Sequence, residues 1–247
     1  MYQLGVVSIS FRRYAPQEIL AAMQQAGLSC IEWGSDVHAP CDDEAALTAL
    51  AQLQAEYGIT CCSYGTYFKL GVTPMEELER YILAAKRLGT DVLRLWCGSK
   101  GSADYTPQER EELFALCRQA AAIAATHGVT LCMECHGYTY TDTKESALAL
   151  MQAVDSPHFR MYWQPCQTPA ENEAYAALLA LYTEHLHVFN WVGMERFPLA
   201  QGLDHWRRYL QVLGGSHALL LEFMPDDDLA TLAQEAAALK ELAGDRV

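Results

Sequence analysis

The chain has 247 residues, 51% of them hydrophobic, which is enough for one large α/β domain with a sizeable core or for two small domains. Its 31 acidic and 17 basic residues give a formal net charge of -14, which argues against a nucleic-acid partner because phosphate neutralisation needs clustered lysine and arginine. No apolar run approaches the roughly 18 residues that span a bilayer, and Met1 to Leu4 lack the basic start of a signal peptide. We therefore expect a cytoplasmic protein with no membrane partner and with its nine cysteines reduced.

Strands and helices are predicted to alternate along the whole sequence. Short apolar, β-rich runs predict strands at Leu4–Ser10, Ser29–Trp33, Ile59–Tyr64, Asp91–Trp96, Val129–Cys135, Phe159–Trp163, His185–Trp191 and Ala218–Phe223. Capping residues or proline before a longer apolar pattern predict helices at Pro16–Ala26, Asp42–Tyr57, Thr73–Leu88, Thr106–His127, Lys144–Val154, Ala170–Glu184, Leu203–Leu213 and a last one ending near Ala243. The stretches Gly65–Gly71 and Val192–Gly202 are predicted to be loops.

This alternation indicates parallel strands joined by crossover helices. Eight such units in 247 residues, without a linker-like break, predict an α/β fold of the closed, parallel (β/α)8 TIM-barrel type over residues 1–247 as a single domain. A doubly wound open sheet is the alternative. That fold usually carries a glycine-rich phosphate turn after its first strand, and Ser8–Tyr14 has none.

The carboxyl ends of the predicted strands are rich in polar and aromatic residues, whereas the amino ends are not. Chemistry in a TIM barrel gathers at the carboxyl ends, so this asymmetry predicts a small-molecule pocket there. Glu134 is the clearest sign, because an ionised carboxylate at the end of a buried strand needs a cation or a donor. The residues at or just beyond these ends include Glu32, Trp33, His38, Arg94, Trp96, Glu134, His136, Gln164, His187, Asn190, Trp191, Arg196 and Glu222.

The ends of the fifth to eighth strands offer Glu134, Gln164, His187 and Glu222, which we call the four-residue centre. Successive strand ends ring one point, where a hard divalent cation such as Mn²⁺ or Mg²⁺, with Co²⁺ and Zn²⁺ as further candidates, accepts carboxylate, amide and imidazole ligands. The two glutamates also suit proton transfer, one as base and one as acid. Structural alternatives stay open: a buried Glu222–Arg94 ion pair, His187 as a core histidine, and Gln164 as a structural residue.

Other residues at the strand ends are predicted to contact a substrate. Tryptophans can pack against the C–H faces of a sugar or cyclitol, and histidine or arginine can orient hydroxyl groups. Arg196 lies on the loop after the seventh strand, where barrels often bind phosphate or carboxylate. The predicted substrate contacts are Trp33, His38, Arg94, Trp96, His136, Asn190, Trp191 and Arg196. Ordinary core packing is the alternative for each tryptophan, and a solvated surface position is the alternative for Arg196.

Short stretches at the strand ends also resemble a known family over nearly the whole chain. These stretches are Ile31–His38, Met133–Gly137, Thr141–Thr143, Tyr162–Pro165, His185–Phe189, Arg196–Gly202 and Leu221–Phe223. In this order and spacing they resemble the xylose-isomerase-like TIM barrels, the sugar and sugar-phosphate isomerases and epimerases, which are related to inosose dehydratase and endonuclease IV.

The resemblance implies a single divalent metal held by Glu, Asp, His and Glu from the fifth to the eighth strand. Glu134, His187 and Glu222 match this set, whereas Gln164 takes the place of the aspartate. Gln167 takes the place of a histidine that contacts substrate or metal in many members. The change from Asp to Gln keeps an oxygen donor but removes a negative charge, so we expect weaker metal binding.

The resemblance implies an isomerase or epimerase that acts on a sugar or sugar-like polyol through an enediolate, with Glu134 and Glu222 as the acid/base pair. One alternative is a lyase or dehydratase of a cyclitol or keto-sugar on the same scaffold. Another is a non-catalytic sugar-binding barrel, which the two glutamine positions favour. A DNA-repair endonuclease would need a multi-zinc cluster and a basic surface that this sequence lacks. The expected partner is a small carbohydrate or polyol, and a homo-oligomer stays open.

Overall fold

Strands and helices alternate through residues 1–166 and 169–246, the part of the chain that the computed structural model describes. The strands are β1 (Gln3–Val7), β2 (Cys30–Gly34), β3 (Thr60–Leu70), β4 (Val92–Cys97), β5 (Thr130–Glu134), β6 (Phe159–Trp163), β7 (Thr183–Val188), β8 (Asn190–Val192), β9 (Glu195–Phe197) and β10 (Ala218–Leu221). The helices are α1 (Pro16–Ala26), α2 (Glu44–Glu56), α3 (Leu78–Leu88), α4 (Pro107–His127), α5 (Lys144–Val154), α6 (Asn172–Leu179), α7 (Leu203–Leu213) and α8 (Leu232–Ala243). None of these helices has both the length and the apolar character needed to cross a membrane.

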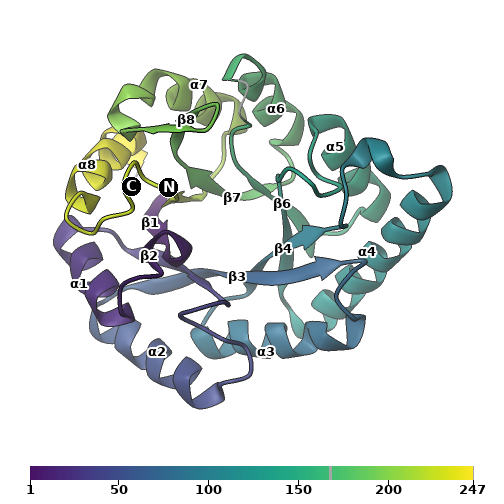
Figure 1. Ribbon diagram of the computed structural model, residues 1–247, viewed down its shortest axis with the longest axis horizontal. Coiled ribbons are helices and arrows are strands. Elements are labelled where there is room, and N and C mark those ends of the chain that lie inside the picture. The colour runs from purple at the N-terminus through teal and green to yellow at the C-terminus, as the bar shows by residue number, and fades with distance from the viewer. Residues whose placement is uncertain (167–168, 247) are drawn as a thin grey trace.

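The described strands form a closed parallel barrel in the order β1-β10-β7-β6-β5-β4-β3-β2. Figure 1 shows these strands as an inner ring and the eight helices as an outer ring around them. The predicted fold, a closed (β/α)8 TIM barrel, is confirmed. The expectation that residues 1–247 form a single domain stays a prediction.

Helix caps determine where α4 begins and ends. The backbone N–H of Glu109 donates to the hydroxyl oxygen of Thr106 at 3.2 Å, and the backbone N–H of Thr106 donates to the Glu109 carboxylate at 2.8 Å. Pro107 follows in the first turn, and Gly128 ends the helix with a left-handed φ of 64°. The chain then enters β5, whose last residue is Glu134.

Two stretches predicted as loops contain strand, which corrects those predictions. β3 continues through Gly65 to Leu70, because Gly65 allows a close approach inside the barrel and does not end the strand. A Cβ atom at Gly65 would lie 2.4 Å from Oε1 of Glu32. The predicted loop Val192–Gly202 contains β9, which pairs with β8 in an antiparallel hairpin. The strand predicted over His185–Trp191 is divided between β7 and β8.

The barrel interior changes from apolar to charged along its strands. Cys132 of β5 belongs to an interior apolar cluster with Tyr162 and Leu220. Alternation along the strand then turns Glu134, two residues later, toward the same interior. The fold therefore places a carboxylate just above an apolar barrel floor, at the carboxyl end of the strands.

Candidate metal centre and substrate cavity

The four-residue centre predicted from the sequence is gathered at one point. Glu134 is the last residue of β5, Gln164 directly follows β6, His187 lies in β7, and Glu222 directly follows β10. Nδ1 of His187 lies 3.1 Å from Oε1 of Gln164, 3.2 Å from a Glu222 oxygen and 3.5 Å from a Glu134 oxygen. The ligand atoms of the two glutamates and the histidine all lie within 4.8 Å of one another, and the three side chains are buried.

These spacings fit one divalent cation. Ligand atoms at about 2.1 Å from a cation, set at right or tetrahedral angles, lie about 3.0–3.4 Å from each other. The amide of Gln164 is oriented to offer its oxygen to a cation. Its Nε2 donates to the carbonyl of Cys135 at 2.7 Å, and its Oε1 therefore faces His187. Two carboxylates, an amide oxygen and an imidazole nitrogen are donors that Mn²⁺ and Mg²⁺ accept.

The buried charge around the centre is unbalanced in the direction that a cation would correct. Nη1 of Arg94 donates to Glu134 at 2.7 Å, and Nε donates to Glu32 at 2.9 Å, in place of the Glu222–Arg94 pair considered as an alternative. With the histidine neutral, three carboxylates against one guanidinium leave an excess of two negative charges, on side chains that are no more than 6% exposed. A divalent cation would neutralise that excess, whereas uncompensated buried charge is costly.

The pKa values of the centre follow from burial and from these charges. Burial alone would raise the pKa of Glu134, but the neighbouring Arg94 and His187 outweigh burial and lower the pKa to about 2. Burial would lower the pKa of His187, whereas Glu222 and then the other two carboxylates raise it well above its ordinary value of 6.5. Without a cation, the raised pKa favours the protonated form of His187, and a cation that binds Nδ1 would displace that proton.

Glu32 contacts both Arg94 and His187, although no role was predicted for it from the sequence. It is fully buried, Ser63 donates its hydroxyl to Oε2 at 2.8 Å, and Nε2 of His187 lies 3.6 Å from Oε1. A sequence signal was present, because the alternation that turns Ile31 and Trp33 toward the helices turns Glu32 into the barrel. An ionised carboxylate in that position needs partners, as Glu134 does.

A cavity of about 690 Å³ opens above the four-residue centre, within the size range of small-molecule sites. Its walls include four of the predicted substrate contacts, and three of these are the aromatic side chains Trp96, His136 and Trp191. Nε1 of Trp96 donates to the Glu134 carboxylate, and the ring of His136 lies 5.3 Å from the Trp96 ring. Arg94 also borders the cavity, but it is 2% exposed and is paired with two carboxylates. These contacts favour a positioning role for Arg94 over direct binding of a substrate.

Two of the predicted substrate contacts point away from this cavity. Trp33 is fully buried between the barrel and α2, and its Nε1 donates to Gln54 at 2.7 Å. Nε2 of His38 lies 3.0 Å from the carbonyl oxygen of Tyr14, and the His38 ring packs against Trp33. The side chains that border the cavity include neither Trp33 nor His38. Gln167 lies outside the described residues.

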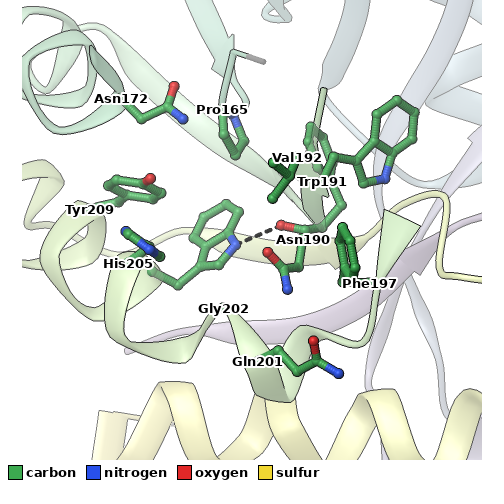
Figure 2. A pocket seen from close by; sticks show the side chains of 12 residues that line it. Pro165, Asn172, Asn190, Trp191, Val192, Phe197, Gln201, Gly202, His205 and Tyr209 are labelled. Carbon is green, nitrogen blue, oxygen red and sulfur yellow. Dashed lines mark hydrogen bonds between the residues drawn. The ribbon is translucent and has the colours of Figure 1, made fainter. Parts of the chain in front are cut away.

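A second cavity, of about 230 Å³, lies between the β8–β9 hairpin and the start of α7. Figure 2 shows Asn190 among the side chains around it, with Tyr209 and His205 on one side and Phe197 on the other. Asn190 borders this cavity and donates from Nδ2 to the carbonyl oxygen of Pro198 at 3.0 Å. The structure thus places Asn190 beside the main cavity and not in its wall.

Arg196 holds the β8–β9 hairpin beside the cavity of about 690 Å³ through contacts with Asp227 and Phe223. Its guanidinium donates to Asp227 at 2.6 Å and lies 5.1 Å and 5.0 Å from the ring centres of Trp191 and Phe223. Trp191 borders both cavities, and its Nε1 donates to the carbonyl oxygen of Phe223 at 3.1 Å. Arg196 therefore holds the cavity wall in place.

Known proteins resemble this chain in sequence and in fold. A family model described as xylose isomerase-like TIM barrel matches residues 20–243. A 3-dehydroshikimate dehydratase from Bacillus anthracis is 27% identical over 161 residues, which cover 56% of this chain and 57% of the dehydratase. The structure of the probable 3-DHS dehydratase AsbF from Bacillus anthracis, involved in petrobactin synthesis, has a TM-score of 0.83 at 20% identity and covers 97% of this chain and 99% of its own. An L-ribulose 3-epimerase structure has a TM-score of 0.73 at 17% identity, and the match covers 98% of this chain and 94% of the epimerase.

Proposed function

Because the chain belongs to the xylose isomerase-like TIM barrel family, we propose that it is a divalent-metal-dependent lyase that removes water from a small β-hydroxy ketone. The observation that carries the proposal is the buried four-residue centre beneath a cavity of about 690 Å³, in a cluster where three carboxylates, those of Glu32, Glu134 and Glu222, face the single guanidinium of Arg94. The similarity to 3-dehydroshikimate dehydratase supports dehydration over isomerisation and makes 3-dehydroshikimate the first substrate to try.

Dehydration of a β-hydroxy ketone needs a proton acceptor and a way to hold developing negative charge. Loss of a proton from the carbon beside the carbonyl leaves an electron pair, which forms the new double bond as the C–O bond to the β-hydroxyl breaks. The departing hydroxyl takes up a proton and leaves as water, and an α,β-unsaturated ketone remains. The chemistry that a bound divalent cation supplies here is stabilisation of the negative charge on the carbonyl oxygen.

We assign the proton transfer to Glu222. One oxygen of Glu134 already accepts from both Arg94 and Trp96, and the lowered pKa of Glu134, about 2, keeps it ionised. Glu222 borders the cavity, and its carboxylate contacts His187 at 3.2 Å. It can take the proton from carbon and deliver the same proton to a hydroxyl that leaves from the same face. In this proposal Glu222 carries the proton and Glu134 stays ionised, in place of the acid/base pair predicted from the sequence.

The test is turnover of the purified protein with Mn²⁺ in D₂O, using 3-dehydroshikimate and a panel of ketoses and inososes. We expect a product that is lighter than the substrate by one water. It should form only with the metal, and protein treated with EDTA should form none. Binding without turnover across the panel would contradict the proposal and favour a sugar-binding barrel.

An isomerase or epimerase is the second candidate. The observation in its favour is that Glu134 and Glu222 lie on the same imidazole nitrogen at 3.5 Å and 3.2 Å, as a two-carboxylate proton shuttle needs. A product of unchanged composition that has gained deuterium from the solvent would support this candidate over the lyase.

A further inference from the structure

We propose that Glu32 is a positioning residue for metal binding, which holds the His187 ring so that Nδ1 faces the cation. This inference rests on the metal centre of the proposed function and adds a residue to it. Glu32 comes from β2, which β1 and β10 separate from β7 in the closed barrel, so the two side chains meet in the barrel interior.

Glu32 faces Nε2 of His187. This atom is buried and has no hydrogen-bond partner among the residues that the structure describes, yet it lies 3.6 Å from Oε1 of Glu32. A histidine that binds a metal through one ring nitrogen almost always donates its other N–H to a carboxylate, carbonyl or water. Glu32 is a carboxylate in that place, so it selects the tautomer whose Nδ1 is free to bind a cation.

Glu32 is itself held by two hydrogen bonds. Its Oε2 accepts from the Ser63 hydroxyl at 2.8 Å, and its Oε1 accepts from Nε of Arg94 at 2.9 Å. The other side of the same guanidinium donates to Oε2 of Glu134 at 2.7 Å, which leaves Oε1 of Glu134 toward His187. One buried network therefore orients two ligands of the centre, a histidine through Glu32 and a glutamate through Arg94.

The backbone makes room for this network at Gly65. A Cβ atom on Gly65 would lie 2.4 Å from Oε1 of Glu32 and 2.7 Å from Nη2 of Arg94. Only a glycine at this point of β3 allows the carboxylate and the guanidinium to meet. Gly65 therefore provides the space in which the Glu32–Arg94 ion pair lies.

The experiment compares Mn²⁺ affinity, measured from the electron paramagnetic resonance signal of free Mn²⁺, in wild type, Glu32→Gln and Glu235→Gln. Glu235 is the matched control, because it is also a buried carboxylate, 5% exposed, but it lies on α8 and accepts from the backbone of Leu199 at 2.9 Å. We expect Glu32→Gln to bind Mn²⁺ about 10–100-fold more weakly than wild type, and Glu235→Gln to stay within about twofold.

Equal affinity in wild type and Glu32→Gln would overturn the inference and leave the metal centre intact. A wild type that binds no Mn²⁺ would overturn the metal centre and this inference together. A measurement on the unaltered protein covers the case in which Glu32→Gln does not fold. In ¹⁵N-labelled wild type with Mg²⁺, we expect the ring proton of His187 on Nε2, and a proton on Nδ1 would overturn the proposal.

Discussion

Replacing Arg94 with methionine tests whether its guanidinium is the counter-charge of the buried carboxylates. The substitution keeps much of the side-chain volume but removes the partner of Glu32 at 2.9 Å and of Glu134 at 2.7 Å. Arg94 is 2% exposed, so water cannot replace the lost donors. The variant would keep three buried carboxylates with only His187 to offset them.

The size of the loss follows from the cost of an unpaired buried charge. Breaking a buried ion pair by removing one partner costs about 3–5 kcal/mol. A chain of 247 residues unfolds with an entropy of about 0.5 kcal/mol per degree, so each kcal/mol lowers the melting temperature by about 2 °C. We therefore expect Arg94→Met to melt about 6–10 °C below wild type.

The assay is thermal unfolding of EDTA-treated protein followed by circular dichroism. Arg80→Met is the control, because Arg80 is 48% exposed and pairs with Glu77 on the surface, so a shift of about 1 °C or less is expected. Adding Glu32→Gln to Arg94→Met should cost less than the sum of the two single losses, because the double variant removes both partners. A loss below about 2 °C in Arg94→Met, or simple additivity, would refute the reasoning.

Three further outcomes follow from the site. Glu222→Gln should abolish the loss of water from 3-dehydroshikimate, as followed by proton NMR, and retained turnover would remove Glu222 from the proton transfer. Gly65→Ala should melt about 2–6 °C lower, because its Cβ would overlap Glu32 and overpacking costs about 1–3 kcal/mol; Gly137→Ala, with open space around its Cβ, should stay within about 1 °C. Mn²⁺ affinity should rise with pH, by up to about tenfold per unit, until the raised pKa of His187 is passed, because the cation displaces its proton. Calorimetry in buffers of different ionisation heat should show that proton release, and no release at pH 6.5 would contradict the assignment.

The raised pKa of His187 also predicts how the stability of the metal-free protein changes with pH. The folded protein holds the His187 proton more tightly than the unfolded chain does, because the folded pKa is raised above 6.5. This proton therefore stabilises the metal-free fold fully below pH 6.5, and the contribution is lost as the pH rises through the raised value.

Strand alternation and helix caps were sufficient to predict the barrel. The capping box of Thr106 and Glu109 and the left-handed Gly128 place α4 where the sequence indicates it. The same reasoning placed Glu134 at the end of a strand, and closure of the barrel brings it within 3.5 Å of His187. Local periodicity thus predicts which residues face the barrel interior, and topology alone brings the four-residue centre together.

Contacts across the barrel could not be predicted in the same way. The meeting of Glu32 with His187 depends on the stagger of the strands, including an irregularity in the pairing of β2 with β3 between Ile31 and Glu32. Gly65 resembles a strand end in sequence because glycine usually weakens strands, although here it provides space. Trp33 could have been excluded from the substrate contacts, because its neighbour Glu32 faces the interior and alternation turns Trp33 the other way.

The most direct measurement is an anomalous difference map from crystals of the wild-type protein soaked in Mn²⁺. We predict one strong peak within about 2.0–2.6 Å of Nδ1 of His187 and of oxygen atoms of Glu134, Gln164 and Glu222. No peak inside the four-residue centre, or a peak bound to Nε2 of His187, would contradict it.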